Sequence, residues 1–263
     1  MLSRWLIRVT GLGYLLVILA APVGLVFYRA FENGFGAAWD AVTTPDAVHA
    51  LKLTLEIAII AVPANTIFGI ICALAIVRYP LRGSGVLNAF VDLPLALSPV
   101  VVGLAFLLLY GQQGWFGPWL ADHGVQIVFA LPGMILVTIF ISLPFVVREV
   151  VPVLREIGTD QEQAAETLGA SAWQTFRRIT LPAIRWAVVY GVVLTTARAL
   201  GEFGAVSVMS GRIQGQTETM TLHVQGAYEN FDYTAAYACS VVLALVAIFT
   251  LTLMTAFRPK EGR

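Results

Sequence analysis

The chain has 263 residues, of which 58% are hydrophobic and only 12% are charged, and its mean hydropathy is +0.81. An average soluble domain has about 25% charged residues, so a soluble protein of this length could not cover its surface with so few charges. The formal net charge is zero, which argues against a basic surface for nucleic acid.

Six apolar stretches are long enough to cross a membrane, since a helix needs about 20 mostly apolar residues to span about 30 Å of hydrocarbon. The apolar run of the first is too long for a signal peptide, and no small-residue cleavage site ends it cleanly. We therefore expect an all-α membrane protein of about six transmembrane helices, forming a single domain over residues 1–263. The expected spans are Val9–Tyr28, Leu53–Val77, Val86–Tyr110, Ile127–Val147, Trp186–Met209 and Tyr233–Phe257.

The basic residues predict the orientation of these spans, because Lys and Arg are more frequent in cytoplasmic segments. With the N-terminus in the cytoplasm, the outside segments or span edges hold only Arg29, Lys52 and Arg212. We therefore expect both termini to be cytoplasmic, and Trp115 and Trp119 to lie at the outer interface. The twelve basic residues on the inside are then Arg4, Arg8, Arg78, Arg82, Arg148, Arg155, Arg177, Arg178, Arg185, Arg258, Lys260 and Arg263.

The longest polar segment, about residues 151–185, lies between the fourth and fifth spans on the expected cytoplasmic side. Two helix starts are predicted within it. Thr159 with Glu162 and Ser171 with Gln174 each fit a capping box, in which two side chains satisfy free backbone amides reciprocally.

A turn is predicted between these two helices. Gly169 can take the left-handed conformation that ends the first helix, and Pro182 is expected to end the second because the residue before a proline avoids the helical region. Ala164 and Ala165 give the first helix small side chains that would fit a partner's groove. Taken alone, the segment is as compatible with an ordinary helical hairpin as with a docking element.

A motif in this segment resembles the EAA loop of the ABC importer permeases, whose pattern is Glu-Ala-Ala, three residues, Gly, nine residues and Ile-x-Leu-Pro. In that family the loop forms a helix that docks into a cleft of the cytoplasmic ATPase. Gln163 departs from the pattern, where the family usually has Glu, and leaves Glu162 and Glu166 as acidic alternatives. The resemblance assigns ATPase coupling to Glu162, Gln163, Ala164, Ala165, Gly169, Ile179, Leu181 and Pro182.

Further strings resemble one branch of that family, the sulfate/thiosulfate permeases of the CysW type, over roughly residues 45–257. The string Gly201-Glu202-Phe203-Gly204 is shared with molybdate and tungstate permeases, so these stay an alternative. The residues that follow this string, as far as Val208, favour sulfate as the substrate. The resemblance implies a type I bundle, MetI-like or molybdate-permease-like, with a cytoplasmic coupling helix. The strings are Ser98–Val101, Leu143–Pro152 and Thr196–Val208.

The same resemblance implies the partners: a cytoplasmic ABC ATPase dimer, a second and related permease, a periplasmic sulfate-binding protein and membrane lipid. The sequence contains no Gly-x4-Gly-Lys-Ser/Thr phosphate loop, so ATP and Mg are expected on the partner ATPase, and this chain is not expected to be an enzyme by itself. No cofactor or metal is expected in this chain. His123 has no second ligand at metal-site spacing and is expected to be a solvated loop residue.

Charged residues within the spans are few, and they define the candidate translocation path. Arg198 and Glu202 stand at i and i+4 on one helix face, where they form either a structural ion pair or a source of positive potential for an anion. Ser98 and Pro99 complete the predicted path. A secondary transporter would need coupling-ion groups at mid-membrane, and an intramembrane enzyme would need a catalytic pair. Neither reading explains the coupling loop.

Close packing is expected where small residues and prolines interrupt the spans, because they let helix backbones approach. We therefore expect spans three to five to pack against the second permease, or against one another within this chain. The residues that allow this approach are Pro94, Pro99 and Gly103 in the third span and Gly201 and Gly204 in the fifth.

Overall fold

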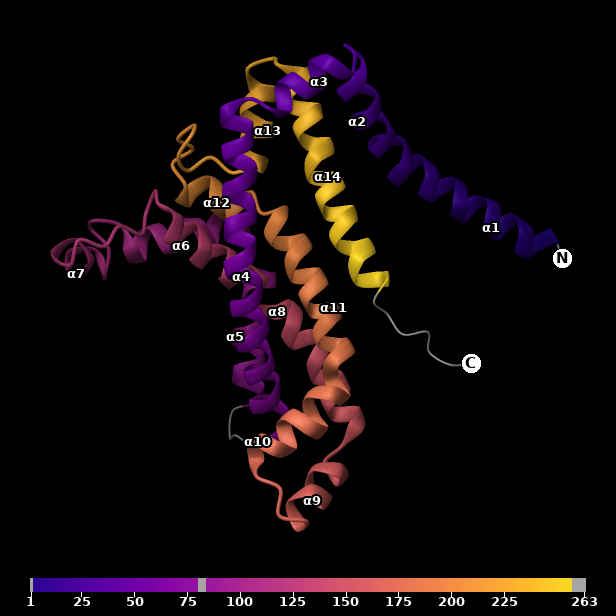
Figure 1. The fold of residues 1–263 in the computed structure, drawn as a ribbon, viewed down its shortest axis with the longest axis vertical. Coiled ribbons are helices and arrows are strands. Elements are labelled where there is room, and N and C mark those ends of the chain that lie inside the picture. Colours follow the sequence, from indigo (N-terminus) through magenta and orange to yellow (C-terminus); the bar gives the residue numbers. More distant parts are fainter. Residues whose placement is uncertain (1, 80–83, 257–263) are drawn as a thin grey trace.

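The computed structural model describes residues 2–79 and 84–256, and within these residues every regular element is helical (Figure 1). This confirms the all-α prediction. The α-helices are α1 Leu2–Leu15, α2 Ala21–Phe31, α3 Phe35–Val42, α4 Pro45–Arg78, α5 Ser84–Ala96, α6 Pro99–Tyr110, α7 Gly117–Asp122, α8 Leu131–Ile157, α9 Asp160–Thr167, α10 Ala172–Thr175, α11 Leu181–Leu200, α12 Gly204–Met209, α13 Met220–Glu229 and α14 Tyr233–Ala256. Two π-helical turns connect them, η1 Leu16–Ala20 and η2 Phe176–Thr180.

Three long helices, α4, α8 and α11, pack side by side and form the core (Figure 1). They meet at Val146 of α8, which is fully buried. A Cβ atom added at Gly69 of α4 would lie 2.7 Å from the Val146 Cβ, and one added at Gly191 of α11 would lie 2.7 Å from the Val146 Cα. Only glycine fits at these two positions, so the absence of side chains lets the backbones approach closely, as is common between membrane helices.

The helices that are long and apolar enough to cross a membrane correspond to the predicted spans. Within residues 2–79 and 84–256, five are continuous, and α5 with α6 forms a sixth as a pair bent by 109°. The prediction of about six spans is therefore confirmed, with Phe257 at the end of the last outside the described residues. The continuous spans are Arg8–Phe31, Pro45–Arg78, Leu131–Ile157, Ala172–Leu200 and Tyr233–Thr250.

The third span was expected to be one helix over Val86–Tyr110, and this is wrong. The chain leaves α5 at Ala96 and starts α6 at Pro99, with Ser98 in an extended conformation (φ −63°, ψ 135°). The proline ring disfavours a helical conformation at the residue before it, which breaks the helix at this point.

The fifth span was expected to run from Trp186 to Met209, and this is wrong at its C-terminal end. Helix α11 ends at Leu200, and a separate short helix, α12, begins at Gly204. Glu202 stabilises the break, because its Oε1 accepts a hydrogen bond at 2.9 Å from the Ala205 amide in the first turn of α12.

At its other end this span is longer than expected, since Pro182 does not end a helix. The chain is helical from Ala172 through η2 into α11, and Leu181 has helical angles (φ −62°, ψ −44°). The wider π-helical turn Phe176–Thr180 lies directly before the proline. Such turns relieve the clash and the missing hydrogen bond that a proline causes in a helix.

The first span forms an arm beside the bundle. Helices α1 and α2 extend away from the core in Figure 1, and α2 contacts α14, the last helix of the described residues. The Asn33 side-chain amide donates to the Thr234 hydroxyl at 2.8 Å at this contact. None of the apolar window within Arg8–Phe31 is buried by the described residues, which leaves its surface to lipid or to another protein.

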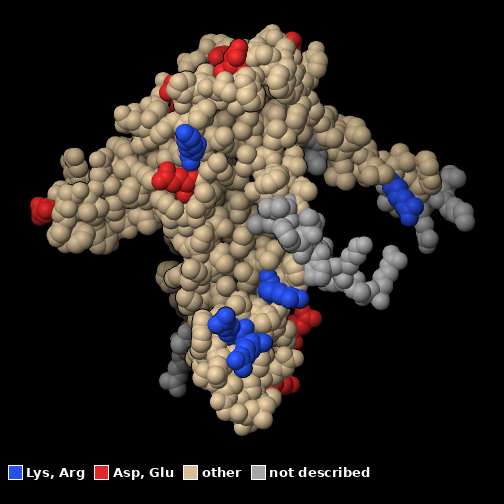
Figure 2. All heavy atoms as spheres, in the orientation of Figure 1, with Lys and Arg blue, Asp and Glu red and all other residues tan. Residues whose placement is uncertain are grey.

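Residues 148–185, a basic segment of the expected cytoplasmic side, run to the lower end of Figure 1, where α9 and α10 lie, whereas α1, which contains Arg4 and Arg8, lies in the arm beside the bundle. Figure 2 shows several Lys and Arg side chains at this end and few charges on the face between the two ends. Arg82 and the C-terminal Arg258, Lys260 and Arg263 lie outside the described residues. The cytoplasmic location of both termini stays a prediction from the distribution of basic residues.

Candidate functional site

The polar segment between α8 and α11 forms a hairpin of α9 and α10 at the lower end of the molecule (Figure 1). Gly169 turns the chain between the two helices with φ +85°, as predicted, and apart from its two chain neighbours no residue has an atom within 4 Å of where its Cβ would be. Its conformation, and not its surroundings, therefore requires glycine.

One of the two predicted capping boxes is present. The backbone amide of Gln174 donates to the Ser171 hydroxyl at 3.4 Å, and the backbone amide of Ser171 donates to the side-chain oxygen of Gln174 at 2.9 Å. The box predicted at Thr159 is wrong, because the carboxylate of Glu162 is occupied elsewhere. The Thr159 hydroxyl instead accepts a hydrogen bond from the side-chain amide of Gln163 at 3.2 Å.

Glu162 points back toward the bundle and binds two distant residues. Its Oε2 lies 2.8 Å from Nε of Arg78 at the end of α4, and its Oε1 accepts from Nη2 of the same arginine at 3.2 Å. The Thr180 hydroxyl, just before α11, also donates to Oε1, at 2.8 Å. Glu162 thus serves contacts within the chain, and the sequence offered no signal that Arg78, one basic residue among many, would be its partner.

The predicted coupling residues divide into two groups by exposure. Gln163 and Ala164 are exposed, as is the neighbouring Glu166, whereas Ala165 is buried against the hairpin. Farther along the segment the residues Ile179 and Leu181 are half-buried and Pro182 is exposed. The outward face of α9 is therefore small, polar and open to a partner.

A second site lies at the other end of α11, where the predicted ion pair is present. Nη2 of Arg198 lies 2.7 Å from Oε2 of Glu202. The Glu202 side chain is 2% exposed and that of Arg198 is 29% exposed. Because Oε1 of Glu202 also caps α12, the carboxylate has a structural role whatever else the arginine does.

The structure brings Pro99, at the start of α6, next to Gly204, which follows Glu202 of this ion pair by two residues. A Cβ atom at Gly204 would lie 2.8 Å from the Pro99 Cβ, and one at Gly103 would lie 2.9 Å from the carbonyl oxygen of Ala205. The break before α6 and the break before α12 are therefore neighbours, and all four predicted path residues lie in one region. Interrupted helices that meet within a bundle are typical of transporter binding sites.

Another charged pair within the spans was not predicted as a pair. Asp92 of α5 accepts from Nε of Arg148 in α8 at 2.9 Å. Both side chains are more than a third exposed, so the pair contributes little to stability.

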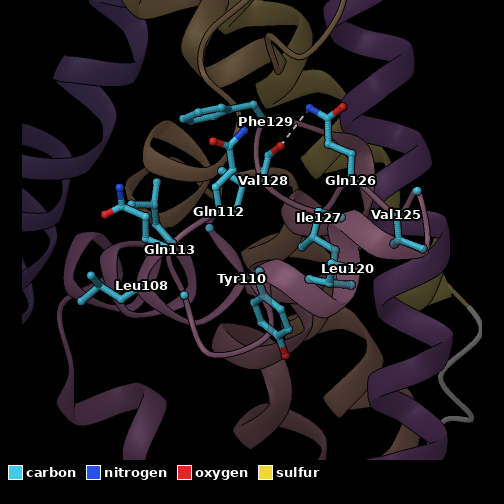
Figure 3. A pocket seen from close by; sticks show the side chains of 16 residues that line it. Leu108, Tyr110, Gln112, Gln113, Leu120, Val125, Gln126, Ile127, Val128 and Phe129 are labelled. Carbon is cyan, nitrogen blue, oxygen red and sulfur yellow. Dashed lines mark hydrogen bonds between the residues drawn. The ribbon is translucent and has the colours of Figure 1, made fainter.

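A hollow of about 860 Å³ in the described part of the chain lies away from both sites (Figure 3). It is lined by residues 107–129, from the end of α6, from α7 and from the loop that follows, and contains none of the predicted site residues. Its polar side chains include Gln112, Gln113 and Gln126, which are neutral amides. An anion would find no positive side chain among the residues that line it.

The loop residues singled out in the sequence lie near this hollow. His123 is exposed and stacks on Trp119, with ring centroids 4.4 Å apart, and Trp115 is 89% exposed. Among the described residues, no three His, Cys, Asp or Glu side chains are grouped so that they could hold a metal ion.

Comparison with known proteins places this geometry in a family. A family model described as "Binding-protein-dependent transport system inner membrane component" matches residues 65–263. The sulfate transport system permease protein CysW of Synechocystis sp. is 47% identical over 259 residues, which cover 98% of this chain and 94% of that protein. CysW of Escherichia coli is 46% identical over 251 residues, which cover 95% of this chain and 86% of that protein.

More distant relatives share the same architecture. The sulfate transport system permease protein CysT of Escherichia coli is 37% identical over 254 residues, which cover 97% of this chain and 92% of that protein. Among solved structures, a bacterial alginate ABC transporter in complex with alginate pentasaccharide-bound periplasmic protein has a TM-score of 0.81 at 18% identity, covering 99% of this chain and 96% of its own. That last likeness supports the fold alone.

Proposed function

Since the chain belongs to the family of binding-protein-dependent transport system inner membrane components, we propose that it is one permease subunit of an ATP-driven importer of sulfate and thiosulfate. The observation that carries this proposal is the 47% identity to a CysW sulfate permease across 98% of the chain. The fold agrees, because a multi-pass helical bundle of the inner membrane with an exposed helical hairpin suits a permease driven from outside the bilayer.

The second permease of the complex would be a related but different chain. Identity to CysT, at 37%, is lower than identity to CysW, at 46%, in the same organism, Escherichia coli. A CysT-like chain is therefore the natural partner in a heterodimer, with an ABC ATPase dimer on the cytoplasmic side and a periplasmic sulfate-binding protein on the other. Native mass spectrometry that found two copies of this chain and no second permease would contradict the heterodimer.

The two sites take different parts in this function. The exposed face of α9, with Gln163, Ala164 and Glu166, would dock on the ATPase, which binds ATP and Mg. Arg198 is partly exposed beside the two helix breaks, where its charge would lower the energy of a dianion crossing the membrane. Its tight pairing with Glu202 would keep the anion from being held too strongly to leave.

The proposal is tested by reconstituting all four components in proteoliposomes and measuring uptake of radioactive sulfate. We expect uptake that requires ATP and the binding protein and that excess thiosulfate inhibits. Uptake of molybdate or tungstate in preference to sulfate would change the proposed substrate but would still support an ATP-driven importer. Uptake that follows an imposed proton or sodium gradient without the ATPase would instead support a secondary transporter.

A further inference from the structure

Arg78 makes contacts with the chain beyond its ion pair with Glu162. It is the last residue of α4, its side chain is 11% exposed, and its guanidinium also reaches the end of α8. Nη1 donates to the carbonyl oxygen of Leu154 at 3.0 Å, and Nη2 donates to that of Gly158 at 2.7 Å. Because the last carbonyls of a helix lack partners within it, Arg78 satisfies groups that would otherwise be open and fixes α4 to the end of α8.

Glu162 extends these contacts to the coupling helix. Its carboxylate binds Arg78 on one side and the hydroxyl of Thr180, which is 3% exposed, on the other. We refer to the side chains of Arg78, Glu162 and Thr180 with the carbonyls of Leu154 and Gly158 as the Arg78 cluster. The cluster joins α9 to the ends of α4 and α8 and to the start of α11, the three helices of the core.

Few other polar contacts hold α9 to the bundle. Within the described residues, the hydrogen bonds and ion pairs from α9 to α4 all involve Arg78, and the hydrogen bond to η2 is that of Thr180. Ala165 is the buried apolar residue of this helix. Without the Arg78 cluster, α9 would be attached by its flanking loops and one small side chain.

We propose that Arg78 is a positioning residue for energy coupling, which makes α9 move as one body with the ends of the three core helices. A displacement imposed on α9 by a bound ATPase then reaches the transmembrane core and is not lost in tilting of α9 alone. This inference rests on the proposed function, because it requires that a partner ATPase docks on α9. It assigns Glu162 to contacts within the chain and leaves the partner to the exposed residues Gln163, Ala164 and Glu166.

The first experiment compares two matched variants of the complete reconstituted complex, Glu162→Gln and Asp160→Asn. Each removes one carboxylate from α9, but only Glu162 belongs to the Arg78 cluster. We expect Glu162→Gln and Arg78→Gln to assemble and to hydrolyse ATP while the sulfate transported per ATP falls about tenfold, a typical size for a lost coupling interaction. Asp160→Asn, at the exposed first residue of α9, should keep the wild-type ratio. A wild-type ratio in assembled Arg78→Gln overturns the inference.

A second measurement does not depend on transport or on the substrate. Spin labels on cysteines introduced at Leu168, which is 89% exposed, and at Ile71 of α4, which is 57% exposed, report the distance between α9 and α4, while the native Cys72 and Cys239 are buried. We expect a narrow distance distribution in the otherwise unchanged protein and a broad one with Arg78→Gln. A narrow distribution in both overturns the inference.

Failure of the proposed function and failure of Arg78→Gln to assemble can each be distinguished from failure of this inference. A wild-type complex that transports no sulfate contradicts the proposed function, whereas the spin-label distances still test the Arg78 cluster. If Arg78→Gln fails to assemble, Arg78→Lys replaces it, because lysine keeps the charge but lacks the planar fork that reaches the carboxylate and both carbonyls. A broadened distribution with Arg78→Lys then supports the inference, and an unchanged one overturns it.

Discussion

The two ion pairs at the ends of α11 hold the chain in different ways. Arg78 and Glu162 stand 84 residues apart in the sequence and join separate helices, with side chains 11% and 17% exposed. Arg198 and Glu202 stand four residues apart and bridge a break in one stretch of chain, with Glu202 only 2% exposed.

The comparison teaches that the same chemistry serves two purposes. The local pair determines the path of the backbone between α11 and α12, so its loss should damage folding and assembly. The long-range pair determines where α9 sits relative to α4 and α8, so its loss should leave the bundle assembled and loosen one helix. The predictions below separate these two effects, beginning with the largest.

The largest effect is expected from Arg198→Gln, which leaves the buried carboxylate of Glu202 without its partner. Breaking a buried ion pair from one side costs about 3–5 kcal/mol, so we expect little assembled complex by size-exclusion chromatography. The double variant Arg198→Gln with Glu202→Gln removes both charges and keeps an acceptor for the Ala205 amide, so assembly should return. Full transport by the assembled double variant would eliminate a role for Arg198 in the anion path.

A smaller loss is expected from Gly103→Val, which acts on the same region without changing a charge. Its Cβ would lie 2.9 Å from both the Ala205 carbonyl oxygen and the Val208 Cβ, and the backbone oxygen cannot move aside. We expect α6 to be pushed from α12 at a cost of about 1–3 kcal/mol, measured as a lower thermal unfolding temperature of the complex. Gly201→Ala is the control, since its nearest contact is at 3.4 Å; an equal loss there would show that packing on α12 is not the cause.

At the coupling hairpin, Gly169→Val should change activity more than assembly. At φ +85° a side chain is strained by roughly 1–2 kcal/mol, so we expect the turn to rearrange and the exposed face of α9 to shift. Membrane insertion should stay normal, and substrate-stimulated ATPase activity of the complex should fall severalfold. Gly169→Asn, which tolerates the left-handed conformation, should retain most of the stimulation. Normal stimulation with Gly169→Val would contradict a coupling role for this turn.

The smallest effect is expected from Ser171→Ala, which removes the cap of α10. Loss of an N-terminal cap costs about 1 kcal/mol, so amide hydrogen exchange in residues 172–176 should become about fivefold faster. Thr159→Ala is the matched control, because its hydroxyl makes no cap hydrogen bond, and exchange in α9 should change little. Similar acceleration in both helices would mean that the predicted cap at Thr159 forms in solution.

Features that depend on neighbouring residues could be predicted from the sequence. The Ser171 capping box, the turn at Gly169 and the Arg198–Glu202 pair each involve residues within four positions of one another, where local geometry decides the contact. The spans were predictable for the same reason, since an apolar stretch of sufficient length has few alternatives in lipid.

Features that depend on distant residues could not be predicted. The capping pattern at Thr159 failed because Glu162 binds an arginine 84 residues away, and a charged partner outweighs a backbone amide. Pro99 could be read as a simple kink. The bend of 109° at this point also reflects how closely Pro99 packs on Gly204, which nothing local to the third span reveals.

The contact between α2 and α14 has a consequence for how the protein is made. Thr234, which receives the hydrogen bond from Asn33, leaves the ribosome 201 residues later. At about 5–20 residues per second, the first span waits about 10–40 s for the helix it packs against. Helices form far faster than this, so the first span spends that interval as a complete but unpartnered helix. Its early neighbours in the bilayer are lipid and the insertion machinery, and the arm reaches its final position only after Thr234 has been synthesised.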